Sequence, residues 1–236
     1  MRIEQQPAYV LHATPYRETS LLLECLTRDH GRVGIVARGV RGEKAKLRRA
    51  QLEPFQPVAL DMLLRGELAT LTAVEPVGVP RRFTGDASLA GLYLNELVVR
   101  LTERQDPHPA LFDAYAVTLA RLTGDAPLAW TLRRFERDLL EAIGYGLQLE
   151  FDSENGEALD ALAHYRYQVD QGAIRTNSGH ARAILGADLL SLHHDQMPDN
   201  TGLRTLRGLM REVIRFHLGG GELRAWRVLA MAGTRR

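Results

Sequence analysis

The sequence has a single cysteine, Cys25, in 236 residues, so it cannot form an intrachain disulfide or a multi-cysteine zinc site. A reducing, cytoplasmic environment is the simplest fit to this shortage. Lysine is almost as scarce, because Lys44 and Lys46 are its only occurrences. The positive charge is therefore carried mainly by arginine, whose planar guanidinium suits bidentate contacts to phosphates and carboxylates. A GC-rich genome, whose codons favour arginine, explains the same bias equally well.

Long apolar runs are also missing. No segment approaches the length needed to cross a membrane, and the first residues, M-R-I-E-Q-Q-P, lack the apolar core of a signal peptide. The composition, 45% hydrophobic and 25% charged, is that of an ordinary globular protein with enough apolar residues for a core. The sequence therefore predicts a soluble intracellular protein.

Signatures of catalysis are absent as well. Neither lysine lies before Ser or Thr in a glycine-rich turn, so the phosphate-binding loop of an NTPase is excluded, and a dinucleotide-binding fingerprint is missing. His193 and His194 beside Asp195 form the only tight histidine group, and adjacent side chains point in different directions, which disfavours a shared metal ion. We expect a protein that is not an enzyme and that needs no metal or other cofactor.

The sequence has instead a strongly basic stretch between residues 28 and 49. Eight basic side chains against two acidic ones give it a local charge of +6, whereas the whole chain has a net charge of +1. Its first half, from Arg32 to Arg38, is rich in β-branched residues and predicts a strand; its second half contains Gly39 and Gly42 and predicts a loop. Such closely spaced cations favour nucleic-acid phosphates as a partner, and a solvated charge run is the alternative. The residues expected to contact nucleic acid are Arg32, Arg38, Arg41, Lys44, Lys46, Arg48 and Arg49.

Short apolar runs separated by turn residues extend from residue 8 to about residue 75. They predict five strands, at residues 9–12, 20–27, 32–38, 57–64 and 68–74. Turns are expected at residues 14–16 and 65–67. Five strands without an intervening helix indicate a small antiparallel barrel, and the OB type fits best. Such a barrel presents a curved face to oligonucleotides, on which Tyr9, Tyr16 or Phe55 would stack bases, although each is more often a core residue.

The apolar period changes after the segment E-P-V-G-V-P, which ends at Pro80. Apolar side chains then recur at a spacing of three or four, which predicts helices at about 86–101, 109–122, 127–143, 180–190 and 202–218. A small hairpin is expected at 165–175. The fold class is therefore α+β: an OB-fold domain at residues 1–80, followed by a mainly α-helical domain at residues 81–236 with a hairpin insertion near residues 150–175.

Arginines accompany the apolar faces of two expected helices. Arg133, Arg134 and Arg137 lie beside the apolar face of the helix at 127–143, and Arg204 lies in the helix at 202–218. Guanidinium groups beside apolar side chains are suited to a carboxylate-rich partner peptide. Solvated outer faces account for the same pattern, so both interpretations stay open.

Six blocks of sequence, taken in order, resemble the RecO family of bacterial recombination mediators. They are A-Y-V-L-H-A-T-P-Y-R-E-T-S at 8–20, G-R-V-G-I-V-A-R-G-V-R at 31–41, L-E-P-F-Q-P at 52–57, G-L-Y-L-N-E-L at 91–97, L-R-R-F-E-R-D-L-L-E-A-I-G-Y-G at 132–146 and Y-R-Y at 165–167. The resemblance extends from about residue 8 to about residue 221. It implies an OB-fold followed by a helical domain.

The resemblance also implies a function in DNA repair and recombination. Family members bind single- and double-stranded DNA, anneal complementary strands and help RecA to replace single-strand-binding protein. The implied partners are RecR, the acidic C-terminal tail of single-strand-binding protein and, indirectly, RecA; the implied location is the cytoplasm, in association with the nucleoid. The resemblance assigns the basic stretch to DNA and Arg133 and Arg204 to the tail. A protein-interaction adaptor with incidental nucleic-acid affinity is the alternative.

One segment departs from the family pattern. Many members hold zinc through four cysteines that begin just after the G-Y-G segment, whereas this chain has Asp152-Ser153-Glu154-Asn155-Gly156 at the position of the first cysteine pair. Zinc is therefore not expected. Without it, we expect the small hairpin that follows to be held by packing alone.

Overall fold

The computed structural model describes residues 1–40 and 46–226, the side chains of residues 46–48 excepted. The chain forms two compact units. The first comprises Met1–Gly124 together with the chain from Leu223 onward, and the second comprises Asp125–Glu222. The compact units separate only after Gly124, so the barrel and the first helices that follow it belong to one unit. The domain boundary expected between residues 80 and 81 stays a prediction.

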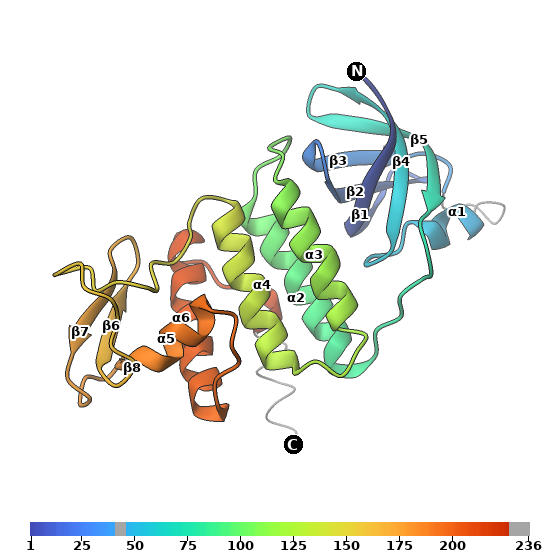
Figure 1. Cartoon of the computed structure of the whole chain (residues 1–236). Coiled ribbons are helices and arrows are strands. Elements are labelled where there is room, and N and C mark those ends of the chain that lie inside the picture. The colour runs from blue at the N-terminus through green and yellow to red at the C-terminus, as the bar shows by residue number, and fades with distance from the viewer. Residues whose placement is uncertain (41–45, 227–236) are drawn as a thin grey trace. The chain divides into compact units, whose positions relative to one another are not determined.

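A closed five-stranded barrel forms the N-terminal part of the first unit (Figure 1). Its strands are β1 (Arg2–Tyr16), β2 (Ser20–Thr27), β3 (Gly31–Ala37), β4 (Pro57–Arg65) and β5 (Leu68–Pro76). They pair in the order β1-β2-β3-β5-β4, and β4 closes the barrel on β1. Only the β3–β5 pairing is parallel. A five-stranded barrel of this kind is an OB-fold, so the expected α+β class with an N-terminal OB barrel is confirmed.

Alternating apolar residues build the barrel because successive side chains of a strand point to opposite faces. In β2, Leu21, Leu23 and Cys25 share the inner face and belong to the core, as the sequence pattern predicts. Complete burial raises the pKa of the Cys25 thiol, so it is held as an inert, protonated core group.

The turn expected at residues 14–16 is wrong. Thr14, Pro15 and Tyr16 belong to β1 and pair with β2, so the chain reverses at residues 17–19 instead. Arg17 makes this reversal possible by adopting a left-handed backbone, with φ of 54°. Non-glycine residues seldom do so, and the sequence signal of Pro15 therefore pointed to the wrong position.

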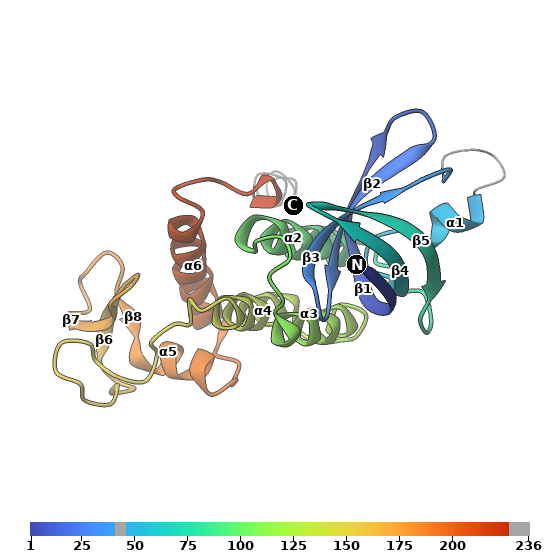
Figure 2. The same cartoon turned by 90° about the horizontal axis from the view of Figure 1, so that it is seen from above.

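The loop expected after β3 contains a short helix, α1 (Lys46–Gln51), which packs beside β5 (Figure 2). The residue types of α1, which are Lys, Leu, Arg, Ala and Gln, all have a high helix propensity. Leu52 follows directly and is buried in the barrel core, which fixes the end of the helix on the barrel. The sequence analysis missed α1 because six residues give too short a period to recognise.

Two helices of the first unit, α2 (Gly85–Leu101) and α3 (Pro109–Arg121), join the barrel through a buried polar network. A bulge in β1 at Leu11 shifts the pairing with β2 and leaves the Leu11 carbonyl directed away from the ladder. Asn95 of α2 donates to that carbonyl at 2.8 Å, and Tyr115 of α3 donates to the Asn95 side-chain oxygen at 2.5 Å. Burial raises the pKa of Tyr115, which keeps its hydroxyl a donor.

The three-or-four spacing predicts an apolar stripe on α2, and the structure departs from it at Leu92; the predicted stripe is Leu89, Leu92, Tyr93, Leu97 and Leu101. Leu92 is 52% exposed, whereas Tyr93, Leu94, Leu97 and Val98 are buried. The buried face is thus turned by about one residue, because Asn95 lies at its centre and faces β1.

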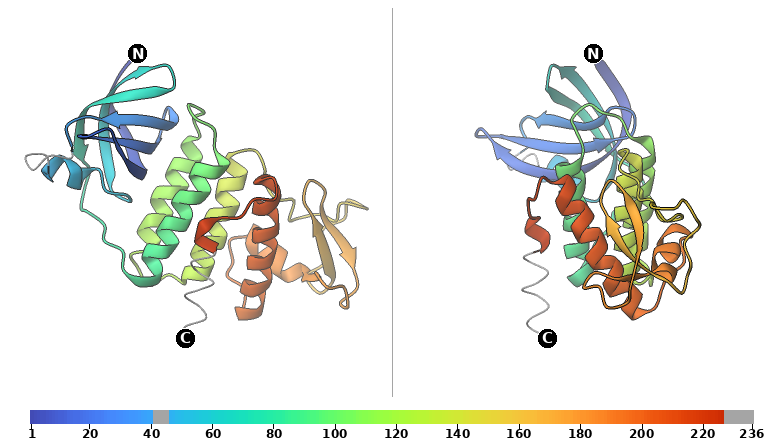
Figure 3. Two further views of the ribbon diagram at one scale, coloured as in Figure 1. Left: turned by 180° about the vertical axis from the view of Figure 1, so that it is seen from behind. Right: turned by 90° about the vertical axis from the view of Figure 1, so that its left-hand side faces the viewer.

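The second unit combines three helices with a small sheet (Figure 3). Its elements are α4 (Leu128–Ala142), β6 (His164–Gln168), β7 (Gly172–Thr176), β8 (Ile184–Leu185), α5 (Gly186–His193) and α6 (Asn200–His217). The expected hairpin is confirmed as β6–β7. The helix expected at 180–190 begins only at Gly186, because Ile184 and Leu185 pair with β6.

Within residues 1–40 and 46–226, no helix is both long and apolar enough to cross a lipid bilayer.

Replacing Asn95 by Leu should destabilise the first unit strongly. The change leaves both the Leu11 carbonyl and the Tyr115 hydroxyl buried without this partner, which should lower the free energy of unfolding by about 2 to 5 kcal/mol. Tyr115→Phe removes only one hydrogen bond and should cost about 1 kcal/mol. Urea unfolding followed by circular dichroism measures both, and equal losses would contradict the central place of Asn95.

Candidate nucleic-acid interface

The β1–β2 turn lies against the residues that follow β3, within the basic stretch of residues 28–49. The Val40 amide donates to the Thr19 carbonyl at 2.9 Å, which joins the two segments. Arg17 and Arg38 are both exposed, one on each segment. The Arg17 guanidinium lies 5.2 Å from the centre of the Tyr16 ring, a cation–π distance. This edge of the barrel therefore carries exposed positive charge beside a partly exposed aromatic ring.

Arg17 is a residue that the sequence analysis did not assign to the interface. It lies outside the basic stretch, and the hydrogen bond between Thr19 and Val40 brings its turn to the end of β3. The signal that would have found it is an arginine that follows an aromatic residue at the tip of a hairpin. In OB-folds the loop between the first two strands is one of the loops that contact oligonucleotides.

The remaining basic residues differ in how they are placed. Arg49, in α1, is exposed. Lys46 and Arg48 belong to the same helix, although the description covers their backbone only. Arg41 and Lys44 lie outside the described residues. All of these residues stay predicted contacts.

Arg32 lies in a network inside the first unit. Its guanidinium donates to Glu24 at 2.8 Å and to the Thr102 carbonyl, at the end of α2, at 2.8 Å. Arg104 also donates to Glu24. The Arg32 side chain is only 12% exposed. Its donors therefore hold β2, β3 and the end of α2 together, and a contact to DNA would require this network to open.

Two of the three candidate aromatics are used in packing. Tyr9 is buried against the rings of Phe112 and Tyr115, with centroid distances of 5.3 and 5.1 Å. Phe55 packs edge-on against Phe83, with 5.1 Å between centroids. Tyr16 is the one of the three whose ring lies at the exposed hairpin tip.

The two arginines assigned to a partner tail have different environments. Arg133, in α4, is buried and forms a bidentate ion pair with Glu136, one helical turn further along. A partner peptide would reach it only if that pair opened. Arg204, in α6, is exposed and donates to Thr201. Of the two, only Arg204 is presented at the surface.

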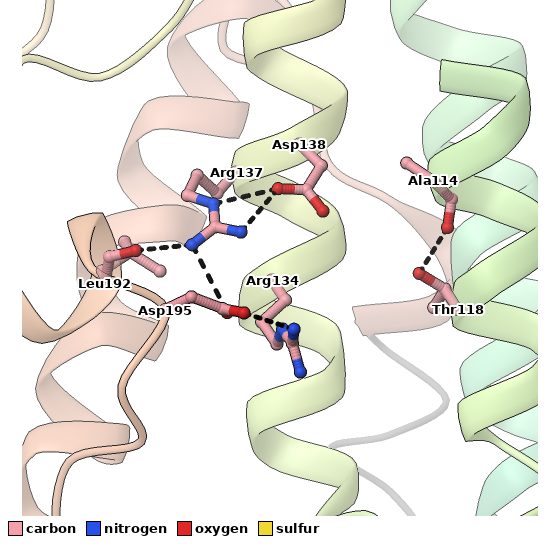
Figure 4. Close-up of polar contacts among 7 residues, drawn as sticks. All are labelled: Ala114, Thr118, Arg134, Arg137, Asp138, Leu192 and Asp195. Atoms are coloured by element: carbon pink, nitrogen blue, oxygen red, sulfur yellow. Dashed lines mark hydrogen bonds and ion pairs between the residues drawn. The ribbon is translucent and has the colours of Figure 1, made fainter. Parts of the chain in front are cut away.

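Arg134 and Arg137 lie near Arg133 on α4. They belong to a cluster that holds the turn after α5 (Figure 4). Arg137 donates to the Leu192 carbonyl at 2.7 Å and to Asp138 at 2.8 Å. Asp195 pairs with Arg134 and lies 3.5 Å from Arg137. These two guanidinium groups therefore connect α4 to α5, which a sequence pattern alone does not reveal.

Hydrogen bonds hold the segment that replaces the first cysteine pair of the zinc-binding family members. Asp152 is buried, and its carboxylate accepts from the Glu154 amide at 2.9 Å. Ser153 ties the segment to the hairpin, because its amide donates to the Ala173 carbonyl and its hydroxyl to the Gln171 carbonyl. The expectation that the hairpin is held by packing alone is therefore wrong.

Groups of at least three His, Cys, Asp or Glu side chains that would surround a metal ion do not occur among the described residues. His193 and His194 are accordingly not part of such a group. His193 lies 3.2 Å from Glu150, which is an ion pair when the imidazole is protonated.

The closed barrel with its parallel β3–β5 pairing, followed by helices, defines the class: an OB-fold protein with a helical C-terminal part. Two family models match it. The model described as "Recombination protein O N terminal" matches residues 1–80, and the one described as "Recombination protein O C terminal" matches residues 82–227. The chain therefore belongs to the RecO family of DNA repair proteins.

Similar proteins support the same assignment over the full length. The chain is 44% identical over 241 residues to the DNA repair protein RecO of Xanthomonas euvesicatoria pv. vesicatoria, with all of both chains covered. It is 46% identical over 240 residues to the DNA repair protein RecO of Stenotrophomonas maltophilia strain K279a, again with complete coverage. The resemblance noted from the sequence is thus confirmed.

Exchanging Arg32 for Gln should affect stability, whereas exchanging Arg38 for Gln should not. The first change removes charge-assisted bonds to Glu24 and Thr102 and should lower the free energy of unfolding by about 1.5 to 3 kcal/mol. The exposed Arg38 should change it by less than about 0.5 kcal/mol. Urea unfolding of the two variants gives the comparison.

A DNA-binding titration of the same two variants completes this test. If Arg32→Gln keeps its stability but loses DNA affinity, the original expectation that Arg32 contacts DNA is correct and its structural role is not.

Proposed function

We propose that this protein is a mediator of homologous recombination that acts by binding and not by catalysis. It binds single- and double-stranded DNA, anneals complementary strands and assists RecA loading onto DNA coated by single-strand-binding protein. RecR and the C-terminal tail of single-strand-binding protein are its direct partners in this proposal, and RecA is an indirect one. Membership of the RecO family supports each of these steps.

The observation that carries the proposal is the meeting of the β1–β2 turn with the end of β3. There the bond between Val40 and Thr19 places Arg17 and Arg38 on adjoining segments, and the basic stretch continues from that point. Guanidinium groups beside the Tyr16 ring offer phosphates a cationic surface and a base a flat face. The strands of the barrel fix this arrangement, because both segments end paired strands.

Annealing follows from charge neutralisation. Two complementary strands repel each other through their phosphates, and a cationic surface that binds them displaces counterions and lowers this repulsion. No covalent bond is made or broken in this process. A DNA-binding surface without a catalytic centre is therefore sufficient for the proposed activity.

The basic residues near the barrel should account for most of the affinity for single strands. If about six cations neutralise phosphates, the logarithm of the binding constant should fall against the logarithm of salt concentration with a slope of about −4. Changing Lys44, Lys46, Arg48 and Arg49 to Glu should abolish binding. A milder pair, Arg38→Gln with Arg49→Gln, should weaken it and make the slope less steep by about 1.4.

A matched control for this measurement is Arg82→Gln with Arg100→Gln. Both residues are exposed, and the charge change is the same. Fluorescence anisotropy of a labelled oligonucleotide at several salt concentrations compares the fourfold variant, the milder pair and the control with the unchanged protein. Unchanged affinity in the fourfold variant would refute the assignment of the basic stretch.

Annealing of complementary strands, one of them coated with single-strand-binding protein, tests the partner site. Removal of the acidic tail from the coating protein should slow annealing. Arg204→Glu should have the same effect on the intact partner, because the exposed guanidinium would be replaced by a charge that repels the tail. Annealing of bare strands should fall less than annealing of coated strands.

Arg207→Glu is the control on the same helix, since Arg207 is also exposed. If bare strands anneal but coated strands do not with either form of the partner, the assignment of Arg204 to the tail fails. If Arg204→Glu abolishes repair in cells while all DNA binding and annealing stay normal, the protein is an adaptor with incidental affinity for nucleic acid.

A further inference from the structure

Three adjoining cavities lie along one side of α6 in the second unit. Their volumes are ≈ 620, ≈ 430 and ≈ 410 Å³. Arg182 and Glu212 line all three, and Phe216 and Tyr167 each line two. The cavities therefore form one continuous depression between α6, the β6–β7 hairpin and the segment before β8, which we call the α6 groove.

The charge of the α6 groove is strongly one-sided. Five guanidinium groups line it, and the only carboxylate among its lining residues is Glu212; the arginines are Arg166, Arg182, Arg204, Arg211 and Arg215. Glu212 is paired with Arg182. The side chains are accessible, since Arg182 is 72% exposed and Arg211 and Arg215 are classed with the exposed residues of α6. The net charge of the lining is therefore +4 in a chain whose total charge is +1.

Aromatic rings accompany these cations. Phe216 is 53% exposed, so part of its ring is accessible beside the arginines. Tyr167 belongs to β6 of the hairpin, and its hydroxyl accepts a hydrogen bond from the Gln148 amide at 3.1 Å. Burial raises the pKa of Tyr167 to about 12, so the ring is neutral at physiological pH. The groove thus offers flat apolar faces between positive charges.

We propose that the α6 groove is a second binding site for single-stranded nucleic acid, so that one molecule holds two strands at once. A strand carries a negative charge and a flat base at every residue, which matches cations spread along a groove with aromatic faces among them. Arg211 and Arg215 are one helical turn apart, about 6 Å along the axis, so they address successive groups of an extended ligand. A short acidic peptide supplies charge but few flat faces.

This inference rests on the proposed function and gives annealing a physical route. When one strand is held by the barrel and another by the α6 groove, the encounter of the strands takes place within one complex. The local concentration of the second strand then replaces its bulk concentration. Annealing by such a molecule is faster than charge neutralisation at a single site allows.

The experiment compares full-length variants with the same loss of charge. The groove variant is Arg211→Gln with Arg215→Gln, and the barrel variant is Arg38→Gln with Arg49→Gln. The control is Arg175→Gln with Arg207→Gln, whose residues lie in the second unit but line none of the three cavities. Circular dichroism establishes that each variant is folded.

Two readouts use oligodeoxythymidine, which has no secondary structure of its own. Native mass spectrometry counts the strands bound to one chain. Anisotropy titrations give the salt slope. We expect two strands for the unchanged protein and the control, one strand for the groove variant, and a slope less steep by about 1.4 in the groove variant.

The outcomes separate this inference from the proposed function. A groove variant that still binds two strands with an unchanged slope overturns the inference, while a loss in the barrel variant would leave the proposed function intact. Loss in the groove variant alone supports the second site and refutes the barrel assignment. If an acidic peptide with an aromatic C-terminus binds the unchanged protein but not the groove variant, and strand binding is unaffected, the groove is a peptide site and the inference is wrong.

Discussion

The hydrogen bond from Asn95 to the bulged carbonyl of Leu11 is the constraint on which the first unit depends. A bulge frees a backbone acceptor inside the protein, and a buried acceptor without a partner is costly. Asn95 satisfies it, and Tyr115 satisfies Asn95 in turn, so three elements share one chain of polar contacts. The same contact covers the barrel wall that carries Tyr9. The exposed tip of the β1–β2 hairpin lies outside this contact.

Arginine has two separate uses in this chain. One group of arginines donates hydrogen bonds to carboxylates and carbonyl groups of its own unit; its members are Arg32, Arg133 and Arg137. Arg38 and Arg204 are exposed. Because the guanidinium stays charged at all physiological pH values, the first use gives fixed joints between elements and the second leaves positive charge exposed at the surface. The abundance of arginine in the sequence is therefore not a measure of DNA-binding capacity.

Much of the architecture follows from the sequence, because alternating and helical apolar spacing are local signals. The five strands, the hairpin and the long helices were predictable for this reason, and so was the exposed face of α6. The roles of Arg32 and Arg17 were not, since Arg32 meets Glu24 only through the pairing of β2 with β3, and the turn that holds Arg17 meets Val40 only in the folded barrel. Arg133 is intermediate: its partner Glu136 is visible at a helical spacing, but its burial depends on how α4 packs.

The chain passes through the second unit before it finishes the first. Leu223 is fully buried, and Arg224 and Ala225 donate their amides to Glu96 of α2 at 2.7 and 2.8 Å. During synthesis, domains generally fold as they leave the ribosome, from the N-terminus onward. Here Glu96 can accept hydrogen bonds from Arg224 and Ala225 only after every residue of the second unit has left the ribosome. The first unit is therefore begun first and completed last, and a chain that ends within α6 lacks the buried Leu223 and both hydrogen bonds to Glu96.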